Sequence, residues 1–165
     1  MKLNSLKDLF ILELQDLYHA ENQILKALPE MAQEASNPQL RNAFERHQEE
    51  TRNQVKRLEQ VFSLVGEKAK GDKCEGIEGI IKEGRRMMKE DMSDEVKDAA
   101  LISAAQRVEH YEMAGYGCVR TYADQLGMRD AASLLQETLE EEGQTDKKLS
   151  AIAESRVNVH AGVSR

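Results

Sequence analysis

The sequence predicts an all-α protein, a bundle of four long helices with one long crossover that carries an additional short helix. Charged residues make up 32% of the chain and aromatic residues only 4%, with 2 prolines, a composition typical of long helices and few strands. Apolar residues recur three or four positions apart over long stretches, and caps or breakers separate these stretches. At 165 residues the chain can form one domain with a buried core.

The first helix is predicted from about residue 5 to about residue 35. Ser5 suits an N-cap and has Asp8 three residues after it. Pro29 lies inside this stretch, so we expect a kink or a break there, because proline cannot donate the backbone hydrogen bond of a helix. The following Ser-Asn-Pro sequence ends the helix, and its proline can occupy the first turn of the next one.

The second helix is predicted from about residue 38 to residue 65, where Gly66 suits a C-terminal cap. The polar segment 67–73 is predicted to be a loop. A short third helix should follow over about residues 75–90, although it contains three glycines, which weaken helices. Loop and short helix together form the crossover.

The fourth helix is predicted from Ser93, as its cap, to about residue 126, where Gly127 ends it. The fifth should cover about residues 130–154. Short turns make the first two helices antiparallel neighbours, and also the last two, whereas the crossover is long enough to return the chain to the opposite end of the bundle. This is the topology of ferritin-like bundles. We expect the bundle in residues 1–155 and a frayed tail in residues 156–165.

Carboxylates and one histidine interrupt the apolar stripe of each long helix near its middle. The interrupting residues are Glu21 in the first helix, His47 and Glu50 in the second, Glu109 and Glu112 in the fourth, and Glu141 and Glu142 in the fifth. An unpaired carboxylate in a core costs several kcal/mol, so buried carboxylates pair, protonate or bind metal. Four mid-helix interruptions predict that these groups meet, although a helical protein this rich in charge also places some glutamates near a stripe by chance.

Helical spacing orders these candidates, because residues three or four apart share a face. Glu21 and Glu112 lie on their stripes, and Glu109 lies at the edge of its stripe. In the second helix the inward position falls on Glu50 or the next residue, and in the fifth on Glu141 or Glu142. An offset of 91 residues aligns Glu21 with Glu112 and Glu50 with Glu141, as expected if two helical hairpins face each other about a pseudo-twofold axis.

Carboxylates and imidazole suit hard or borderline cations such as Fe²⁺, Mn²⁺ and Zn²⁺. Two such ions between four helices need about four carboxylates with nitrogen ligands, which the interrupting residues supply. Gln54 and Asp146 are further candidate oxygen donors. The sequence therefore predicts a carboxylate-rich site for two ions of iron or manganese, and it identifies no catalytic residue.

Five stretches resemble the YciE/YciF-type bacterial stress proteins, a ferritin-like group. They read ELQDLYHAENQILKALP, HQEETRNQV, CEGIEGII, AAQRVEHYEMAGYG and TLEEEGQTDKKL, within a resemblance that covers about residues 6–153. The resemblance implies a ferritin-like bundle, a homodimer and a bacterial stress response. Through the related rubrerythrin-like proteins it also implies a di-metal carboxylate centre.

The wider superfamily places one glutamate on each of two helices and Glu-x-x-His on each of the other two. Glu21 and Glu112 match the single glutamates, and Glu50 with Glu141 or Glu142 matches the others. The histidines differ, since Asn53 and Gln144 occupy the positions three after Glu50 and Glu141, and His47 instead precedes Glu50 by three. A nitrogen-poor site binds Fe²⁺ less tightly and has a different redox potential.

These observations lead to one principal functional hypothesis and two alternatives. The first is a stress-response protein whose two metal ions consume a small oxidant, peroxide or oxygen, as a peroxidase-like oxidoreductase. The second is a non-catalytic, dimeric helical stress protein whose carboxylates are vestigial or structural. The third is a ferritin-like cage that stores iron.

Charge and hydropathy argue against other classes of function. The net charge of −7 argues against binding nucleic acid, which requires a basic face. There is no apolar run of about 18 residues and no signal-peptide stretch, so we expect no membrane contact and a cytoplasmic location. Cys74 and Cys118 match no zinc spacing, and we expect both to be reduced.

Overall fold

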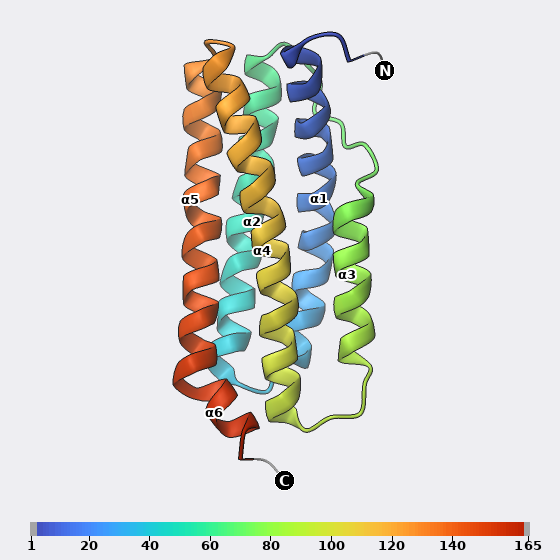
Figure 1. Cartoon of the computed structure of the whole chain (residues 1–165), viewed down its shortest axis with the longest axis vertical. Helices are drawn as coiled ribbons and strands as arrows, with labels where there is room; N and C mark the ends of the chain where they lie inside the picture. Colours follow the sequence, from blue (N-terminus) through green and yellow to red (C-terminus); the bar gives the residue numbers. More distant parts are fainter. Residues whose placement is uncertain (1–2, 164–165) are drawn as a thin grey trace.

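The computed structural model describes residues 3–163 and shows a bundle of long helices aligned along one axis (Figure 1). The helical segments are α1 (Leu6–Glu34), α2 (Pro38–Leu64), α3 (Glu75–Met88), α4 (Asp94–Gln125), α5 (Arg129–Ile152), the π-helical turn η1 (Ala153–Val157) and α6 (Asn158–Ala161). No strand occurs among the described residues. The predicted all-α class is therefore confirmed.

The four long helices α1, α2, α4 and α5 form the bundle, and α3 lies outside it against α1 and α4 (Figure 1). The chain descends in α1, ascends in α2, returns along the crossover past α3, ascends in α4 and descends in α5. Helix α4 thus starts at the end of the bundle where α2 started. This is the predicted ferritin-like arrangement with one long crossover and one additional helix.

Local signals set the ends of the helices close to the predicted positions. The Ser5 side chain accepts a hydrogen bond from the backbone N–H of Asp8 at 3.1 Å, which caps α1. Gly127, between α4 and α5, has a φ of +74°, a left-handed conformation that favours glycine. Helix α1 runs unbroken through Pro29, so the predicted break there is absent.

Asp98, in the first turns of α4, ties this helix to the turn between α1 and α2. Its Oδ1 and Oδ2 atoms accept hydrogen bonds from the backbone N–H groups of Ser36 and Asn37, both at 2.8 Å. The Asp98 side chain is buried. Because Asn37 also caps α2 through its own side chain, one carboxylate fixes the end of α1, the start of α2 and the start of α4 relative to one another.

The C-terminal segment differs from the predicted frayed tail. Residues 153–161 continue as η1 and α6, and Val157 is only 2% exposed within the core. In a π-helical turn residues five apart are neighbours, so Val157 follows Ile152 onto the buried face. Residues 164–165, the end of the predicted tail, lie outside the described residues.

The apolar core consists of two clusters that lie on either side of the middle of the bundle. One cluster includes Ile24, Leu28 and Leu101 and extends under α3 through Ile77 and Ile81. The other contains the phenylalanine and leucine side chains of the opposite half, among them Phe10, Phe62 and Leu135. Within residues 3–163, no helix is both long and apolar enough to cross a bilayer.

We predict that Asp98→Ala lowers the free energy of unfolding by about 2–3 kcal/mol, because two charge-assisted hydrogen bonds are lost and two backbone N–H groups lose their acceptor. Urea denaturation followed by circular dichroism measures this. Asp91→Ala is the control, since Asp91 is exposed in the loop before α4. Equal destabilisation by both substitutions would contradict the role of Asp98.

Candidate metal centre

A layer of buried polar side chains separates the two apolar clusters. Its members come from all four long helices and are at most 3% exposed: Glu21, His47, Thr51, Gln54, Glu109, Glu112, Thr138 and Glu142. Four of these are carboxylates and one is an imidazole, while neither lysine nor arginine is buried among the described residues. The interruptions of the four stripes therefore meet in one place, as the sequence predicted.

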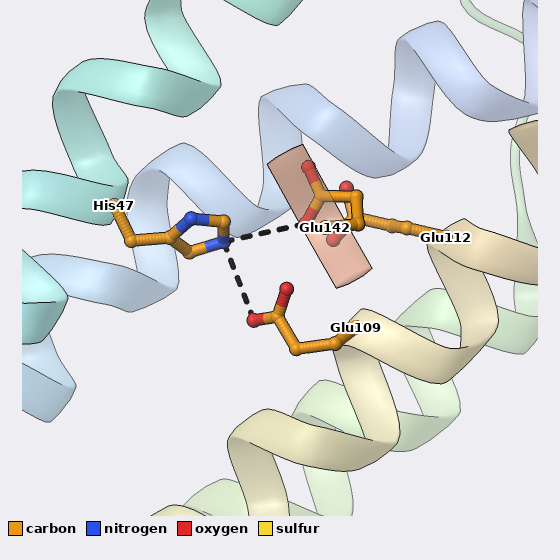
Figure 2. Close-up of side chains that lie close together, drawn as sticks. All are labelled: His47, Glu109, Glu112 and Glu142. Atoms are coloured by element: carbon orange, nitrogen blue, oxygen red, sulfur yellow. Dashed lines mark ion pairs between the residues drawn. The ribbon is translucent and has the colours of Figure 1, made fainter. Parts of the chain in front are cut away.

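One ring nitrogen of His47 on α2 faces carboxylates of both α4 and α5 (Figure 2). Its Nε2 atom is 3.3 Å from Oε1 of Glu109 and 3.8 Å from Oε2 of Glu142. One ligand atom from each of His47, Glu109, Glu112 and Glu142 lies within 4.8 Å of the others. Four potential ligands on three helices therefore converge closely enough to surround a single cation.

Glu21 and Glu112, which the offset of 91 residues relates, complete the layer. The Tyr116 hydroxyl donates a hydrogen bond to Oε1 of Glu21, whereas neither oxygen of Glu112 has a hydrogen-bond partner. Burial, followed by the neighbouring Glu142 carboxylate, raises the pKa of both groups well above the ordinary value of 4.5. Burial and the contact with Glu142 raise the pKa of Glu109 in the same way.

The charge of this layer is unbalanced. Four ionised carboxylates carry −4, and a protonated His47 offsets only one of these charges. Protonation of the carboxyls removes the imbalance, and so does binding of cations, since two divalent ions carry +4. Oxygen atoms of Glu21, Glu109, Glu112 and Glu142 remain without a hydrogen-bond partner, as do both ring nitrogens of His47. Such unpaired buried atoms are the positions that a bound ion would satisfy.

Glu50 and Glu141 lie at the rim of the layer. The Glu50 side chain is 40% exposed, and its Oε2 is 3.5 Å from Nδ1 of His47, a proximity that lowers the pKa of Glu50. Arg57 binds both oxygens of Glu141 at 2.9 Å. The structure thus places Glu142 in the layer and Glu141 outside it, which resolves the ambiguity that the sequence left.

The offset of 91 residues also relates positions that are equally buried. In α2 and α5, however, the buried pair lies one residue after the pair of glutamates that the sequence aligned. Glu142 lies 91 residues after Thr51, and both are fully buried, whereas Glu50 and Glu141 are both at the rim. His47 corresponds in the same way to Thr138, which is also buried. The two hairpins therefore place equivalent positions in the layer, and the single histidine belongs to only one of them.

Glu109 is more deeply buried than its place at the edge of a stripe predicted. Helix α4 packs against α1, α3 and α5, so its buried surface is wider than one stripe. Glu109 faces the side that α3 covers and is 2% exposed. The carboxylate of Glu109 also meets His47 of α2 at 3.3 Å and Glu142 of α5, and these contacts cannot be seen in the stripe of α4 alone.

Two residues of this region have a role that sequence reasoning missed. Tyr116 lies four residues after Glu112 on the same face of α4, is fully buried, and donates a hydrogen bond from its hydroxyl to Glu21. Arg57 is not one of the stripe interruptions, although it lies three residues after Gln54 on the same face of α2, which is a signal that could have identified it. Both side chains hold carboxylates in fixed positions.

The two further candidate oxygen donors have different positions. Gln54 lies in the layer, where its Nε2 donates hydrogen bonds to Oε1 of Glu142 and, at 3.1 Å, to Oε2 of Glu141. Asp146 is turned toward α4, where it accepts a hydrogen bond from Gln106 at 3.0 Å and lies 3.3 Å from Nε2 of His110. The structure therefore does not bring Asp146 into the layer.

Comparison with known proteins identifies close relatives along the whole chain. The family model described as a domain of unknown function (DUF892) matches residues 5–162. Protein YciF of Escherichia coli (strain K12) is 47% identical over 162 residues, which cover 98% of this chain and 98% of YciF.

Solved structures agree with this relationship. The crystal structure of the E. coli stress protein YciF superposes with a TM-score of 0.91, covering 94% of this chain and 99% of YciF at 47% identity. YcfI from Rhodopseudomonas palustris, described as a candidate structural protein, gives 0.90 at 41% identity, with 92% and 97% of the two chains covered. Protein XCC3681 of Xanthomonas campestris gives 0.73 at 21% identity, covering 94% of this chain and 96% of its own, and this likeness concerns the fold alone.

We predict that Glu112→Gln stabilises the chelator-treated protein at pH 8 by about 1–3 kcal/mol, because it removes a buried carboxyl whose oxygens have no partner. A carboxyl with a raised pKa keeps its proton in the folded protein where the unfolded chain has released it. The free energy of unfolding of the metal-free protein should therefore fall as the pH rises above about 4.5.

Thermal unfolding between pH 5 and pH 8 in the presence of chelator tests both statements. The decline in melting temperature should be smaller in Glu112→Gln than in the unsubstituted protein. Glu140→Gln, at an exposed position of α5, should leave the decline unchanged. A Glu112→Gln variant with an unchanged decline would show that this carboxyl is not the source of the pH dependence.

Proposed function

The chain belongs to the DUF892 family and is a homologue of the E. coli stress protein YciF, and from this premise we propose that it is a stress-response protein whose buried carboxylate layer binds two divalent ions of iron or manganese. The observation that supports this proposal most directly is the charge of the layer. Four buried carboxylates face one imidazole without a buried lysine or arginine in the described chain, which is costly unless cations are present.

The donor set fits such ions. Carboxylate oxygens with imidazole nitrogen suit Fe²⁺ and Mn²⁺, and the layer offers four carboxylates and one imidazole. His47 and Glu109 would hold one ion, and Glu21 would hold the other. Glu112 and Glu142 interact electrostatically with both Glu21 and Glu109, so they would help to hold both ions.

The chemistry follows from the ions, and the protein supplies their surroundings. When bound, two ferrous or manganous ions supply one electron each. Two electrons and two protons reduce one hydrogen peroxide to two molecules of water. Tyr116 and Gln54 fix the carboxylates of Glu21 and Glu142 by hydrogen bonds. The apolar clusters on both sides exclude water from the layer. A small oxidant is the substrate that this arrangement fits best.

Glu50 has a different role in this proposal from the ligand role that the sequence predicted. Its Oε2 lies 3.5 Å from Nδ1 of His47, on the side of the ring opposite the other carboxylates. A carboxylate in this position accepts the Nδ1–H hydrogen, which fixes the tautomer that leaves Nε2 free to bind metal. We therefore assign Glu50 as a positioning residue for His47.

The alternative, a non-catalytic helical protein with a vestigial carboxylate layer, has one observation in its favour. The R. palustris relative, which is 41% identical, is described as a candidate structural protein. Metal binding separates the two proposals. The homodimer remains a prediction, which gel filtration tests, and an elution volume of a cage would instead support iron storage.

We predict two equivalents of iron or manganese per chain in protein from metal-supplemented cells, measured by elemental analysis. Removal of the metal should lower the melting temperature, since an ion that binds only the folded state stabilises it. Glu142→Gln should reduce the metal content, whereas Glu140→Gln, two residues away but exposed, should not. If the unsubstituted protein contained no metal, and the double variant Glu21→Ala, Glu112→Ala had the same metal content, the alternative of a vestigial layer would be favoured.

We also predict that Glu50→Gln lowers the affinity for Mn²⁺ by about 10–100-fold, the usual effect of removing a hydrogen-bonded partner of a metal-binding histidine. Competition with a chelating dye measures the affinity. Glu49→Gln is the matched control, because Glu49 precedes Glu50 directly but points to solvent. Equal affinities of the two variants would be inconsistent with a positioning role for Glu50.

A further inference from the structure

Helices α1, α3 and α4 enclose a narrow apolar cavity on the side of the bundle that α3 covers. Apolar side chains such as Met31, Ile81, Met88 and Leu101 line most of it, together with small residues of α3 and α4. Its only charged or polar lining residues are Glu30, Arg85, Lys97 and Glu109. Glu30 and Arg85 are exposed and joined by an ion pair at 2.8 Å, so they mark the mouth of the cavity.

The inner end of the cavity is Glu109, which is 2% exposed. The same carboxylate lies 3.3 Å from Nε2 of His47 through its Oε1, and its Oε2 has no hydrogen-bond partner. Figure 2 shows Glu109 beside His47, with Glu112 and Glu142 close to both. The cavity therefore connects the surface beneath α3 to the carboxylate layer.

The lining selects by polarity and size. Between the mouth and Glu109 the cavity offers aliphatic and thioether groups, so a solute with O–H groups loses its hydrogen bonds to water and gains none. The space open to water-sized molecules is about 40 Å³, which is enough for a small molecule only. Cavities of this chemistry remain dry and take up apolar gases.

A polar approach exists on the opposite side of the layer. There a surface depression between α2 and α5 is lined by Arg46, Glu50, Glu141, Gln144, Thr145 and Lys148. Glu50 joins this depression to Nδ1 of His47. Cations and peroxide therefore have a hydrated approach to the layer, and the cavity under α3 is not needed for them.

We propose that the cavity under α3 is the entry route for dioxygen, and that dioxygen rather than peroxide is the oxidant that reaches the layer through Glu109. Two electrons, one from each of two ferrous ions, and two protons would reduce one dioxygen to one hydrogen peroxide. The route itself rests on the cavity and its lining. Only its use by an oxidant rests on the proposed metal centre.

Dioxygen itself is the probe for the route, because it is paramagnetic and accelerates the relaxation of nearby nuclei. The chain has 7 methionines, which can be labelled at their methyl carbons. Met31 and Met88 line the cavity, whereas Met113 and Met128 are partly buried elsewhere. In chelator-treated protein, the change in methyl relaxation between argon and dioxygen should be greater for Met31 and Met88 than for Met113 and Met128.

Met31 gives the sharper comparison. It is only 8% exposed and less accessible to bulk solvent than Met113 or Met128, so exposure alone predicts the opposite order. A change at Met31 no larger than at Met113 and Met128 would overturn the entry route.

Ala100→Leu should block the cavity, and Ala99→Leu is its matched control. Both alanines are partly buried in α4, but only Ala100 lines the cavity. We expect Ala100→Leu to reduce the dioxygen effect at Met31, and to slow dioxygen consumption by the iron-loaded protein several-fold without changing peroxide consumption. Ala99→Leu should change neither. Equal slowing of both oxidants by Ala100→Leu would overturn the assignment of dioxygen.

A smaller substitution, Gly84→Ala, serves if Ala100→Leu does not fold. A methyl group at Gly84 would stand 3.4 Å from the Ala104 side chain, so it fits while narrowing the cavity. The outcomes also separate this inference from the proposed function. A chain that takes up no iron but shows the dioxygen effect at Met31 has the route without the centre. Iron binding without that effect leaves the proposed centre intact and overturns the route.

Discussion

The central constraint on this protein is the electrostatic cost of four carboxylates enclosed between two apolar clusters. Burial and mutual repulsion raise the pKa of Glu21, Glu109 and Glu112, and the surrounding hydrogen bonds only partly compensate. The rest of the bundle provides the stability that tolerates this layer. Protonation of the carboxyls removes this electrostatic cost, and so would the binding of cations.

The two hairpins contribute unequally to the layer. The relation between α1–α2 and α4–α5 places matching positions inside, as the pairs Glu21 with Glu112 and Thr51 with Glu142 show. The only buried imidazole among the described residues, His47, corresponds to a threonine in the other hairpin. The proposed centre is therefore asymmetric, with nitrogen available to one of its two ions. In the proposed centre this asymmetry would lower the affinity for Fe²⁺ relative to a site with two histidines, and it would make the two ions chemically different.

The crossover has a structural role beyond connecting two hairpins. By packing α3 against α1 and α4, the chain encloses the apolar cavity that Glu109 lines. Opposite this cavity, the rim residues Glu50 and Glu141 are partly exposed and pair with His47 and Arg57. The layer is thus approached from an apolar side and a polar side, a difference that follows from placing a fifth helix on one face of a four-helix bundle.

The sequence by itself determined the helices, their order and the meeting of the stripe interruptions. Capping residues such as Ser5 and Gly127 and the period of the apolar residues are local signals, so they are readable without a structure. Only the tertiary structure decided which of two adjacent glutamates, Glu141 or Glu142, enters the layer. A rotation of one helix by one residue exchanges them, and packing against neighbouring helices sets that rotation. The burial of Glu109 was likewise decided by packing, because its carboxylate meets His47 of α2 and Glu142 of α5, contacts between segments distant in sequence for which no local pattern exists.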